Sequence, residues 1–134
     1  MRFYAFAAAC ALLAISAPGN ASAAASWSPA TATTVTAGIT SRSTFEIQAY
    51  VMLPQQCYSA RIRTLAITSQ LHRSFVVEQM PSTTPCSDMI YKCYVSASYK
   101  LPIQQPFDVM SKGKTWKVHL SMHAPTPMKP SCKG

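Results

Sequence analysis

The sequence predicts an all-β domain, and three observations carry this prediction. Apolar and polar residues alternate with period two in several segments, as they do in strands that bury one face. These segments are separated by turn residues and recur at intervals of about ten residues. No window shows an apolar stripe with the period of a helix. We therefore expect a disulfide-stapled, antiparallel, immunoglobulin-like β-sandwich of about seven strands, with a closed barrel as the alternative.

The first 23 residues are predicted to be a secretory signal peptide. Arg2 precedes an apolar run over residues 3–15, and residues 21–23 form an A-x-A cleavage site. The run is too short to span a bilayer as a stable helix, so the mature chain is expected to begin near Ala24. Lipid attachment at Cys10 is disfavoured because the apolar run continues past it. A secreted or periplasmic location follows from this interpretation.

The rest of the chain divides into three parts. Removing 23 of the 134 residues leaves 111, the length of one domain with a single core. Residues 24–43 are rich in Ala, Ser and Thr, so we expect a flexible leader with at most a short edge strand over residues 33–36. The sandwich domain is expected over residues 44–123. A proline-rich tail over residues 124–134 follows it.

Two segments alternate most clearly between apolar and polar residues. The strand predicted over residues 44–53 places one apolar set on a single face: Phe45, Ile47, Ala49, Val51 and Leu53. The strand predicted over residues 91–101 has a similar set: Tyr91, Cys93, Val95, Ala97, Tyr99 and Leu101. In both segments the residues between are mostly polar. Such segments are typical of strands that cover a core with one face.

The strand expected over residues 58–68 is less regular. Its apolar phase slips after Ile62, so that Leu65 and Ile67 continue the buried face by an odd step. An odd step of this kind requires an extra residue, so we expect a bulge or a twist near Arg63.

The remaining strands are shorter or follow proline-containing loops. A strand is expected over residues 73–80, a loop over residues 81–90 and a short strand over residues 107–110. After a turn at residues 111–114, the last strand has inward and outward sets. Its inward set is Trp116, Val118, Leu120 and Met122, and its outward set is Lys117, His119, Ser121 and His123.

Four cysteines of the mature chain predict two disulfides: Cys57, Cys86, Cys93 and Cys132. Three connectivities exist. If the strands run alternately up and down, the loops that hold Cys57 and Cys86 lie at the same end, which favours their pairing. Cys132 follows the last strand by ten residues, enough extended chain to return roughly 30 Å. A bridge from Cys93 to Cys132 would then pin the tail across the sandwich, and each bridge is expected to contribute about 2–4 kcal/mol.

Several short patterns lie between Phe45 and Leu120: Leu53-Pro54-x-x-Cys57, Phe75-Val76-Val77, Cys86 with Met89, Leu101-Pro102 and Trp116-x-Val118. Together they resemble a small β-sandwich module of exported bacterial proteins and lipoproteins. In that module the L-P-x-x-C turn is joined to a later loop cysteine, so the resemblance also implies the Cys57–Cys86 bridge. The chain departs from the module by having Lys114-Thr115-Trp116 in place of Gly-x-Tyr, and by carrying Cys93 and Cys132. The resemblance implies no activity.

The charge of the chain indicates the kind of partner. Without Arg2, eleven basic residues stand against four acidic ones, a net charge of +7. This imbalance favours an acidic partner, either an unidentified protein or an acidic envelope polymer. The basic residues are dispersed, so no specific nucleic-acid site is expected. No later segment approaches eighteen consecutive apolar residues, so stable membrane insertion is not expected either.

Catalytic chemistry finds little support in the sequence. The four acidic residues do not form the paired carboxylates of a glycosidase: Glu46, Glu78, Asp88 and Asp108. His119 and His123 lie about 13 Å apart on one strand, too far to chelate one ion. No G-x-S-x-G motif is present. We expect no catalytic residue, cofactor or metal site.

A non-catalytic binding module is therefore the predicted function, with a rigid enzyme inhibitor as one form of it. The first candidate surface is the pair of loops over residues 54–58 and 81–90, because sandwiches present contacts on loops at one end. Its candidate contacts are Pro54, Gln55, Gln56, Tyr58, Pro85, Asp88 and Met89. Tyr50 and Tyr94, on the outward phase of their strands, are a second candidate surface. A small hydrolase and a purely structural envelope protein are the alternatives.

Overall fold

A computed structural model describes residues 26–134, and the predicted signal peptide lies outside this range. The described residues form nine strands and no helix, so the all-β prediction is confirmed. None of these residues forms a helix long and apolar enough to cross a membrane. The strands, in chain order, are β1 (Ser28–Pro29), β2 (Thr31–Ile39), β3 (Thr44–Leu53), β4 (Ser59–Ile67), β5 (Arg73–Met80), β6 (Tyr91–Lys100), β7 (Phe107–Ser111), β8 (Lys114–Val118) and β9 (Leu120–Ser121).

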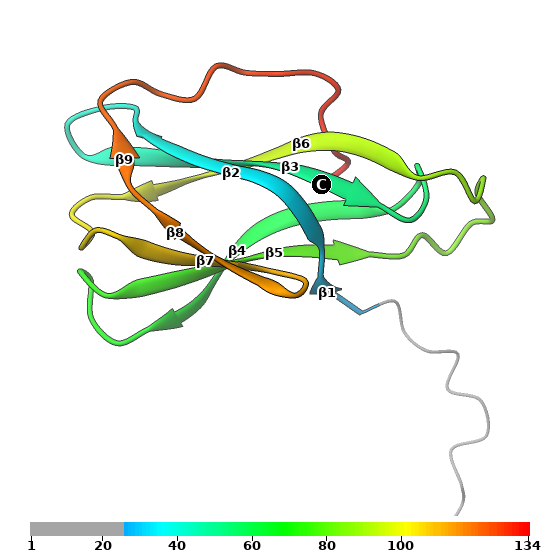
Figure 1. Cartoon of the computed structure of the whole chain (residues 1–134), viewed down its shortest axis with the longest axis horizontal. Coiled ribbons are helices and arrows are strands. Elements are labelled where there is room, and N and C mark those ends of the chain that lie inside the picture. The colour runs from blue at the N-terminus through cyan, green and yellow to red at the C-terminus, as the bar shows by residue number, and fades with distance from the viewer. Residues whose placement is uncertain (1–25) are drawn as a thin grey trace, which may run out of the picture.

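The strands form two sheets that pack face to face (Figure 1). The four-stranded sheet has the order β6-β3-β2-β9. In the five-stranded sheet, β5 pairs with β4 on one side and with β1 and β7 on the other, and β8 extends the sheet beyond β7. Most pairings are antiparallel, but β5–β7 and β2–β9 are parallel. The expectation of a purely antiparallel sandwich is therefore corrected.

The core lies between the sheets and is filled by the inward residues of the alternating strands. All five apolar residues predicted to face inward from β3 are at most 1% exposed. Phe45 packs against Phe75, Tyr99 and Phe107, with ring centroids 5.6–6.2 Å apart. Aromatic side chains bury large apolar areas, so this cluster contributes strongly to the stability of a small domain.

The expected leader is instead part of the fold. Residues 31–39 form β2, which lies between β3 and β9 in the four-stranded sheet and is not an edge strand. Ala32 and Ala37 are buried, and β2 pairs with β3 along almost its whole length. This strand is held by backbone hydrogen bonds and carries mostly small side chains. The alternation of apolar and polar residues along it is therefore too weak to predict the strand.

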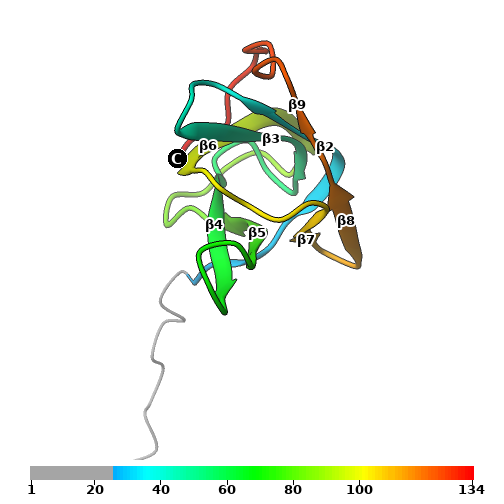
Figure 2. The same cartoon turned by 90° about the vertical axis from the view of Figure 1, so that its left-hand side faces the viewer.

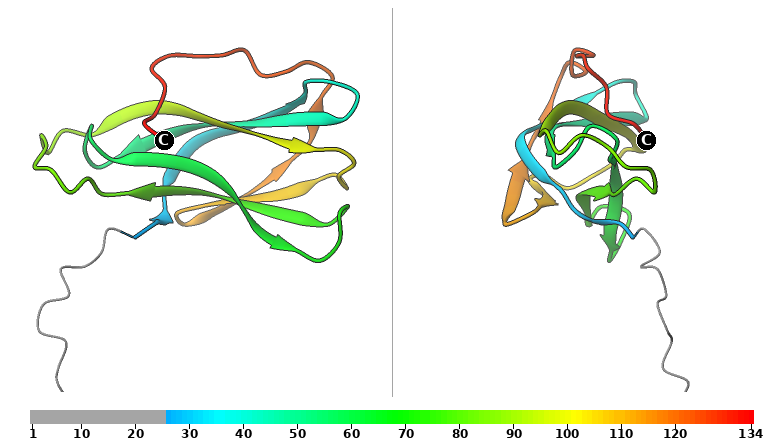
Figure 3. Two further views of the ribbon diagram at one scale, coloured as in Figure 1. Left: turned by 180° about the vertical axis from the view of Figure 1, so that it is seen from behind. Right: turned by 90° about the vertical axis from the view of Figure 1, so that its right-hand side faces the viewer.

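The bulge predicted in β4 is present, but the side chains after it do not face the core. The β4–β5 register shifts between Thr64 and Ala66. Leu65 is 40% exposed and Ile67 is 64% exposed, so the prediction that they continue the buried face is wrong. The end of the β4–β5 hairpin turns away from the four-stranded sheet, which leaves both side chains uncovered (Figure 3).

The order of the strands also differs from a simple up-and-down arrangement. β6 pairs with β3 over ten residues, and β3 and β4 belong to different sheets. Chain direction nevertheless alternates, so the predicted loops still meet at one end. Both predicted disulfides form, Cys57–Cys86 with 6.0 Å and Cys93–Cys132 with 4.9 Å between Cα atoms. Two disulfides in a small chain are typical of an oxidising compartment outside the cytosol.

The tail crosses the outer face of the four-stranded sheet. It leaves β9 and runs to the β6 side of the molecule (Figure 2). At the start of this path it packs closely on Gly38, where an added Cβ would lie 1.9 Å from the carbonyl oxygen of His123. Only glycine allows the two backbones to approach so closely.

The far end of the tail joins the two sheets. The Tyr94 amide donates to the Pro130 carbonyl at 2.8 Å, and the Cys132 amide donates to the Tyr94 carbonyl at 2.7 Å. The Ala60 amide of β4 then donates to the Lys133 carbonyl at 2.7 Å. The tail thus bridges β6, an edge of one sheet, and β4, an edge of the other.

Candidate functional site

The candidate site is the cysteine-bearing end, which we define as residues 54–58 and 81–90. The first segment follows β3 and the second lies between β5 and β6. Pro54 and Pro81 come directly after their strands, and a proline there cannot donate a ladder hydrogen bond. The chain leaves the two sheets at these prolines, and both segments project from the same end of the sandwich (Figure 1).

Two side-chain links fix these segments to each other. The Cys57–Cys86 disulfide joins them covalently. Gln55 Nε2 donates to Asp88 Oδ1 at 2.7 Å, and within the first segment the Tyr58 amide donates to the Gln55 carbonyl at 3.2 Å. The two segments are therefore held as one unit, although Cys57 and Cys86 are 29 residues apart in the chain.

Apolar side chains are exposed on this unit. Met89 is 75% exposed and Ile90 is 64% exposed. Beside them lies an apolar pocket of about 350 Å³, lined by Thr31, Met52, Leu53, Pro54 and Ile90. This volume is at the lower end of the range for pockets that take small ligands or one large side chain.

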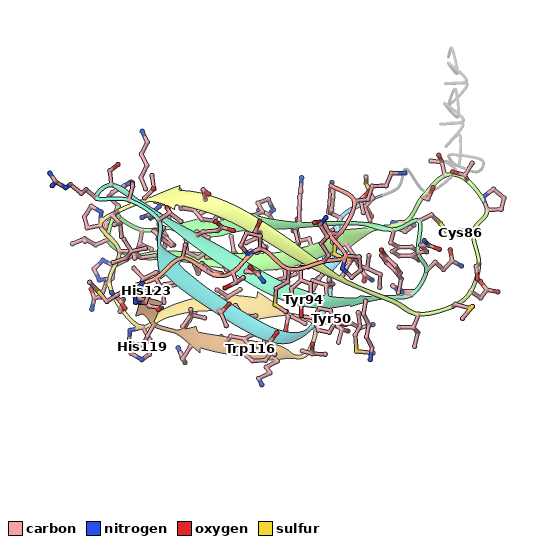
Figure 4. All side chains as sticks on the ribbon, turned by 90° about the horizontal axis from the view of Figure 1, so that it is seen from above. Tyr50, Cys86, Tyr94, Trp116, His119 and His123 are labelled. Carbon is pink, nitrogen blue, oxygen red and sulfur yellow. A yellow bond between two sulfur atoms is a disulfide. The ribbon has the colours of Figure 1, made fainter. Side chains whose placement is uncertain are left out.

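The predicted contact residues separate into three groups. Exposed at the cysteine-bearing end are Pro54, Gln56, Pro85, Asp88 and Met89, with Gln55 half-buried. Tyr58 is also at this end but packs against the hydrophobic core, so its role is structural. Tyr50 and Tyr94 lie elsewhere, on the outer face of the four-stranded sheet, where their rings stack with centroids 4.4 Å apart (Figure 4).

Two residues that line the apolar pocket, Pro54 and Ile90, belong to the loop surface that the sequence predicted, but Thr31, Met52 and Leu53 were not assigned to any site. Met52 lies on the outward phase of β3 and is half-buried, and a methionine at an outward position was the one signal available. Thr31 belongs to β2, which the sequence did not predict in this form. Ile90 lies at the end of the long loop, where no periodic pattern indicates a partner.

The strongest ionic cluster lies on the outer face of the five-stranded sheet. Arg61 Nε lies 2.9 Å from Glu78 Oε2, and Arg63 Nη2 lies 2.6 Å from Glu78 Oε1. The hydrogen bond from Arg63 lowers the pKa of Glu78 below its ordinary value, and Arg61 adds to the effect. The Arg61 guanidinium also lies 4.0 Å from the centroid of the Trp27 ring. The cluster links β4 to β5, and both carboxylate oxygens of Glu78 are paired within it.

The end opposite the disulfide Cys57–Cys86 holds a second pocket, of about 310 Å³. Its lining includes His72, Asp108 and Lys117. Ser69 Oγ lies 2.8 Å from His72 Nδ1 but does not line the pocket, and Asp108 pairs with Lys117 at 2.6 Å. A serine beside a histidine is one element of a nucleophilic site, but here the contact closes a turn between residues 69 and 72.

The single last strand predicted up to His123 is divided in the structure: β8 belongs to the five-stranded sheet and β9 to the four-stranded sheet. Met122, which was predicted to face inward, lies beyond β9 and is 79% exposed, so that part of the prediction is wrong. His119 and His123 are exposed near β9 (Figure 4). No group of three His, Cys, Asp or Glu side chains within residues 26–134 is placed to hold a metal ion.

Comparison with known proteins gave no relative. No protein-family model matches the chain, and no curated protein or solved structure matches it.

Proposed function

We propose that the protein is an exported, non-catalytic binding module that recognises another macromolecule through its cysteine-bearing end. The observation that carries this proposal is the link between two distant segments. The Cys57–Cys86 disulfide and the Gln55–Asp88 hydrogen bond hold exposed Met89 beside an apolar pocket. Loops fixed in this way lose little conformational entropy when they bind.

The chemistry of this surface suits a protein partner. Ile90 and Met89 are large, exposed and apolar, and the pocket beside them can take one side chain of the partner. The net charge of the chain favours an acidic partner, which includes an extracellular enzyme that the module inhibits. In this proposal the sandwich acts as an immunoglobulin-like scaffold, secreted or periplasmic after signal-peptide removal, that presents its loops at one end.

The proposal is tested by comparing two matched substitutions. Ile90 and Ile67 are each 64% exposed, but only Ile90 lies at the cysteine-bearing end. The mature, oxidised protein is used to capture partners from envelope or culture extract. We expect Ile90→Asp to reduce capture of the specific partner at least tenfold and Ile67→Asp to leave it unchanged. Equal capture by the wild-type protein and both variants would contradict the proposal.

A small hydrolase is the second candidate, and the Ser69–His72 contact is the observation that favours it. Binding is preferred because Ser69 lies outside the second pocket and the carboxylate there is paired with Lys117. Labelling by a fluorophosphonate probe that is lost in Ser69→Ala would reverse this preference.

A further inference from the structure

The edge of β6 that faces away from β3 is occupied at both ends and free between them. At one end, the amide and carbonyl of Tyr94 bond to the tail. At the other end, Arg73 Nη2 donates to the Lys100 carbonyl at 2.5 Å. Among the described residues, no strand pairs with β6 on this side between these two points. Ser96 and Ser98 lie in the free interval.

The backbone of these two serines points away from β3. Residues of one strand alternate in the direction of their amide and carbonyl groups, so Ser96 and Ser98 point the same way as Tyr94. Tyr94 bonds to the tail, which fixes this direction as outward. Ser96 and Ser98 therefore present two amides and two carbonyls in the geometry that an added strand requires.

A crevice of about 270 Å³ borders this interval. Its lining includes Ile62 of β4, Val95 and Ser96 of β6, and Cys132 of the tail. Val95 and Ala97 face inward from β6, yet both are only half-buried because β4 does not cover them fully. Side chains on one face of an added strand would cover this apolar surface.

The tail already shows that this edge accepts a strand. It pairs with β6 at Tyr94 and with β4 at Ser59, and runs parallel to both (Figure 3). The added backbone there makes the same contacts with the Tyr94 amide and carbonyl that the free serines can offer.

We infer that an extended peptide segment of a partner protein, with alternating acidic and apolar residues, adds as a strand to β6 at Ser96 and Ser98. The apolar phase would face Val95 and Ala97 across the crevice. The acidic phase is favoured because exposed Lys92 and Lys100 lie on β6 on either side of the interval and Arg61 lines the crevice. Of the acidic residues nearby, Glu46 lies opposite Ser98 on β3, and Glu78 is already paired with Arg61 and Arg63. Recognition of a backbone edge by strand addition is a common mode of peptide binding.

This site is separate from the cysteine-bearing end, so its test does not depend on the proposed function. The probe is an acetylated and amidated six-residue peptide of alternating glutamate and valine, labelled for fluorescence anisotropy and titrated to millimolar concentration. We expect saturable binding that weakens with salt. The same peptide with lysine in place of glutamate should bind at least tenfold more weakly.

The decisive variant is Ser98→Pro. It removes an outward amide without breaking the β3–β6 ladder, because the Ser98 amide does not face β3. Binding is expected to fall at least tenfold, since a carbonyl of the peptide loses its donor. Ser98→Ala keeps the amide and should bind within about threefold of the wild-type protein. Absence of saturable binding to the wild-type protein, or binding unchanged by Ser98→Pro, would overturn the inference.

Hydrogen exchange keeps the inference testable if Ser98→Pro does not fold. In the free wild-type protein, the Ser96 and Ser98 amides should exchange faster than the Val95 and Ala97 amides, which face β3. Added peptide should slow both serine amides selectively. Unchanged exchange at Ser96 and Ser98 in saturating peptide would contradict strand addition.

Discussion

The two ends of the sandwich join distant loops by different chemistry. At the cysteine-bearing end, a disulfide links the segment after β3 to the loop before β6. At the opposite end, the buried guanidinium of Arg73 links the β4–β5 hairpin to the chain after β6. Its Nε donates to the Gln70 carbonyl at 2.9 Å, and its Nη2 donates to the carbonyls of Lys100 and Pro102. At one end the loops are thus joined by a covalent bond. At the other end they are joined by a buried charge that donates hydrogen bonds to backbone carbonyls.

This difference shows that exposure alone does not identify a binding surface. Ile90 and Ile67 are equally exposed at opposite ends. The pocket beside Ile90 is apolar, whereas the pocket at the other end contains His72, Asp108 and Lys117. The cysteine-bearing end therefore combines fixed loops with an apolar pocket, and the opposite end combines fixed loops with a pocket that charged side chains line.

Removing the buried guanidinium should have the largest effect on stability. Arg73→Met leaves the carbonyls of Gln70, Lys100 and Pro102 without their donor, which should cost about 3–5 kcal/mol. Chemical denaturation measures this loss. Arg42→Met, at an exposed arginine, is the control and should change stability by less than about 0.5 kcal/mol. A loss below about 1 kcal/mol in Arg73→Met would show that this end does not depend on the arginine.

Removing the disulfide Cys57–Cys86 should follow closely in size. The double variant Cys57→Ser with Cys86→Ser should lose about 2–4 kcal/mol, because the unfolded chain is no longer closed into a loop. The control, Cys93→Ser with Cys132→Ser, should lose a similar amount. Only the first variant should also lose partner capture below its melting temperature. Equal capture by both variants would mean that loop fixation is not needed for recognition.

Crowding the tail at Gly38, near the end of the sandwich that has no disulfide, should have an intermediate effect on stability. Gly38→Ala forces the chain at His123 to move, at a cost of about 1–3 kcal/mol. The Cys132 amide should then exchange faster. Gly113→Ala is the control: its φ of 75° is strained for alanine, but no atom lies within 4 Å of the added Cβ. Normal exchange at Cys132 in Gly38→Ala would argue against close docking of the tail.

Acid should have the smallest effect on stability. It acts on Glu78, which lies between the two ends of the sandwich. Arg63 and Arg61 lower the pKa of Glu78, so their ion pairs stabilise the fold fully above the ordinary value of 4.5. This contribution is lost as the pH falls below that value and through the folded-state pKa. Glu78→Gln should remove about 1 kcal/mol of this acid dependence, measured by denaturation between neutral and acidic pH. Glu46→Gln should retain it, because Glu46 forms no salt bridge among the described residues.

The sequence predicted the strands better than their partners. Alternation identified β3 and β6 because each buries one face, and the even cysteine count with alternating chain direction was enough to pair Cys57 with Cys86. Alternation does not encode which strand lies beside which, so the β3–β6 pairing and the parallel β5–β7 pairing were not predicted. β2 was predicted only as a short edge strand over residues 33–36, because Ala and Thr give no apolar contrast that would show its full length. Arg73 was missed because its partners are backbone carbonyls, which no side-chain pattern reveals.

The bridge from Cys93 to Cys132 has a mechanical consequence. These cysteines are 39 residues apart, and β7, β8 and β9 lie between them. Tension applied to the tail beyond Cys132 passes through the sulfur atoms into β6 and bypasses that interval. The bypassed strands cannot lengthen under load while the bridge is intact. Resistance to pulling therefore falls first on the start of β6, Tyr91 to Cys93, and on the part of the ladder that holds it to β3.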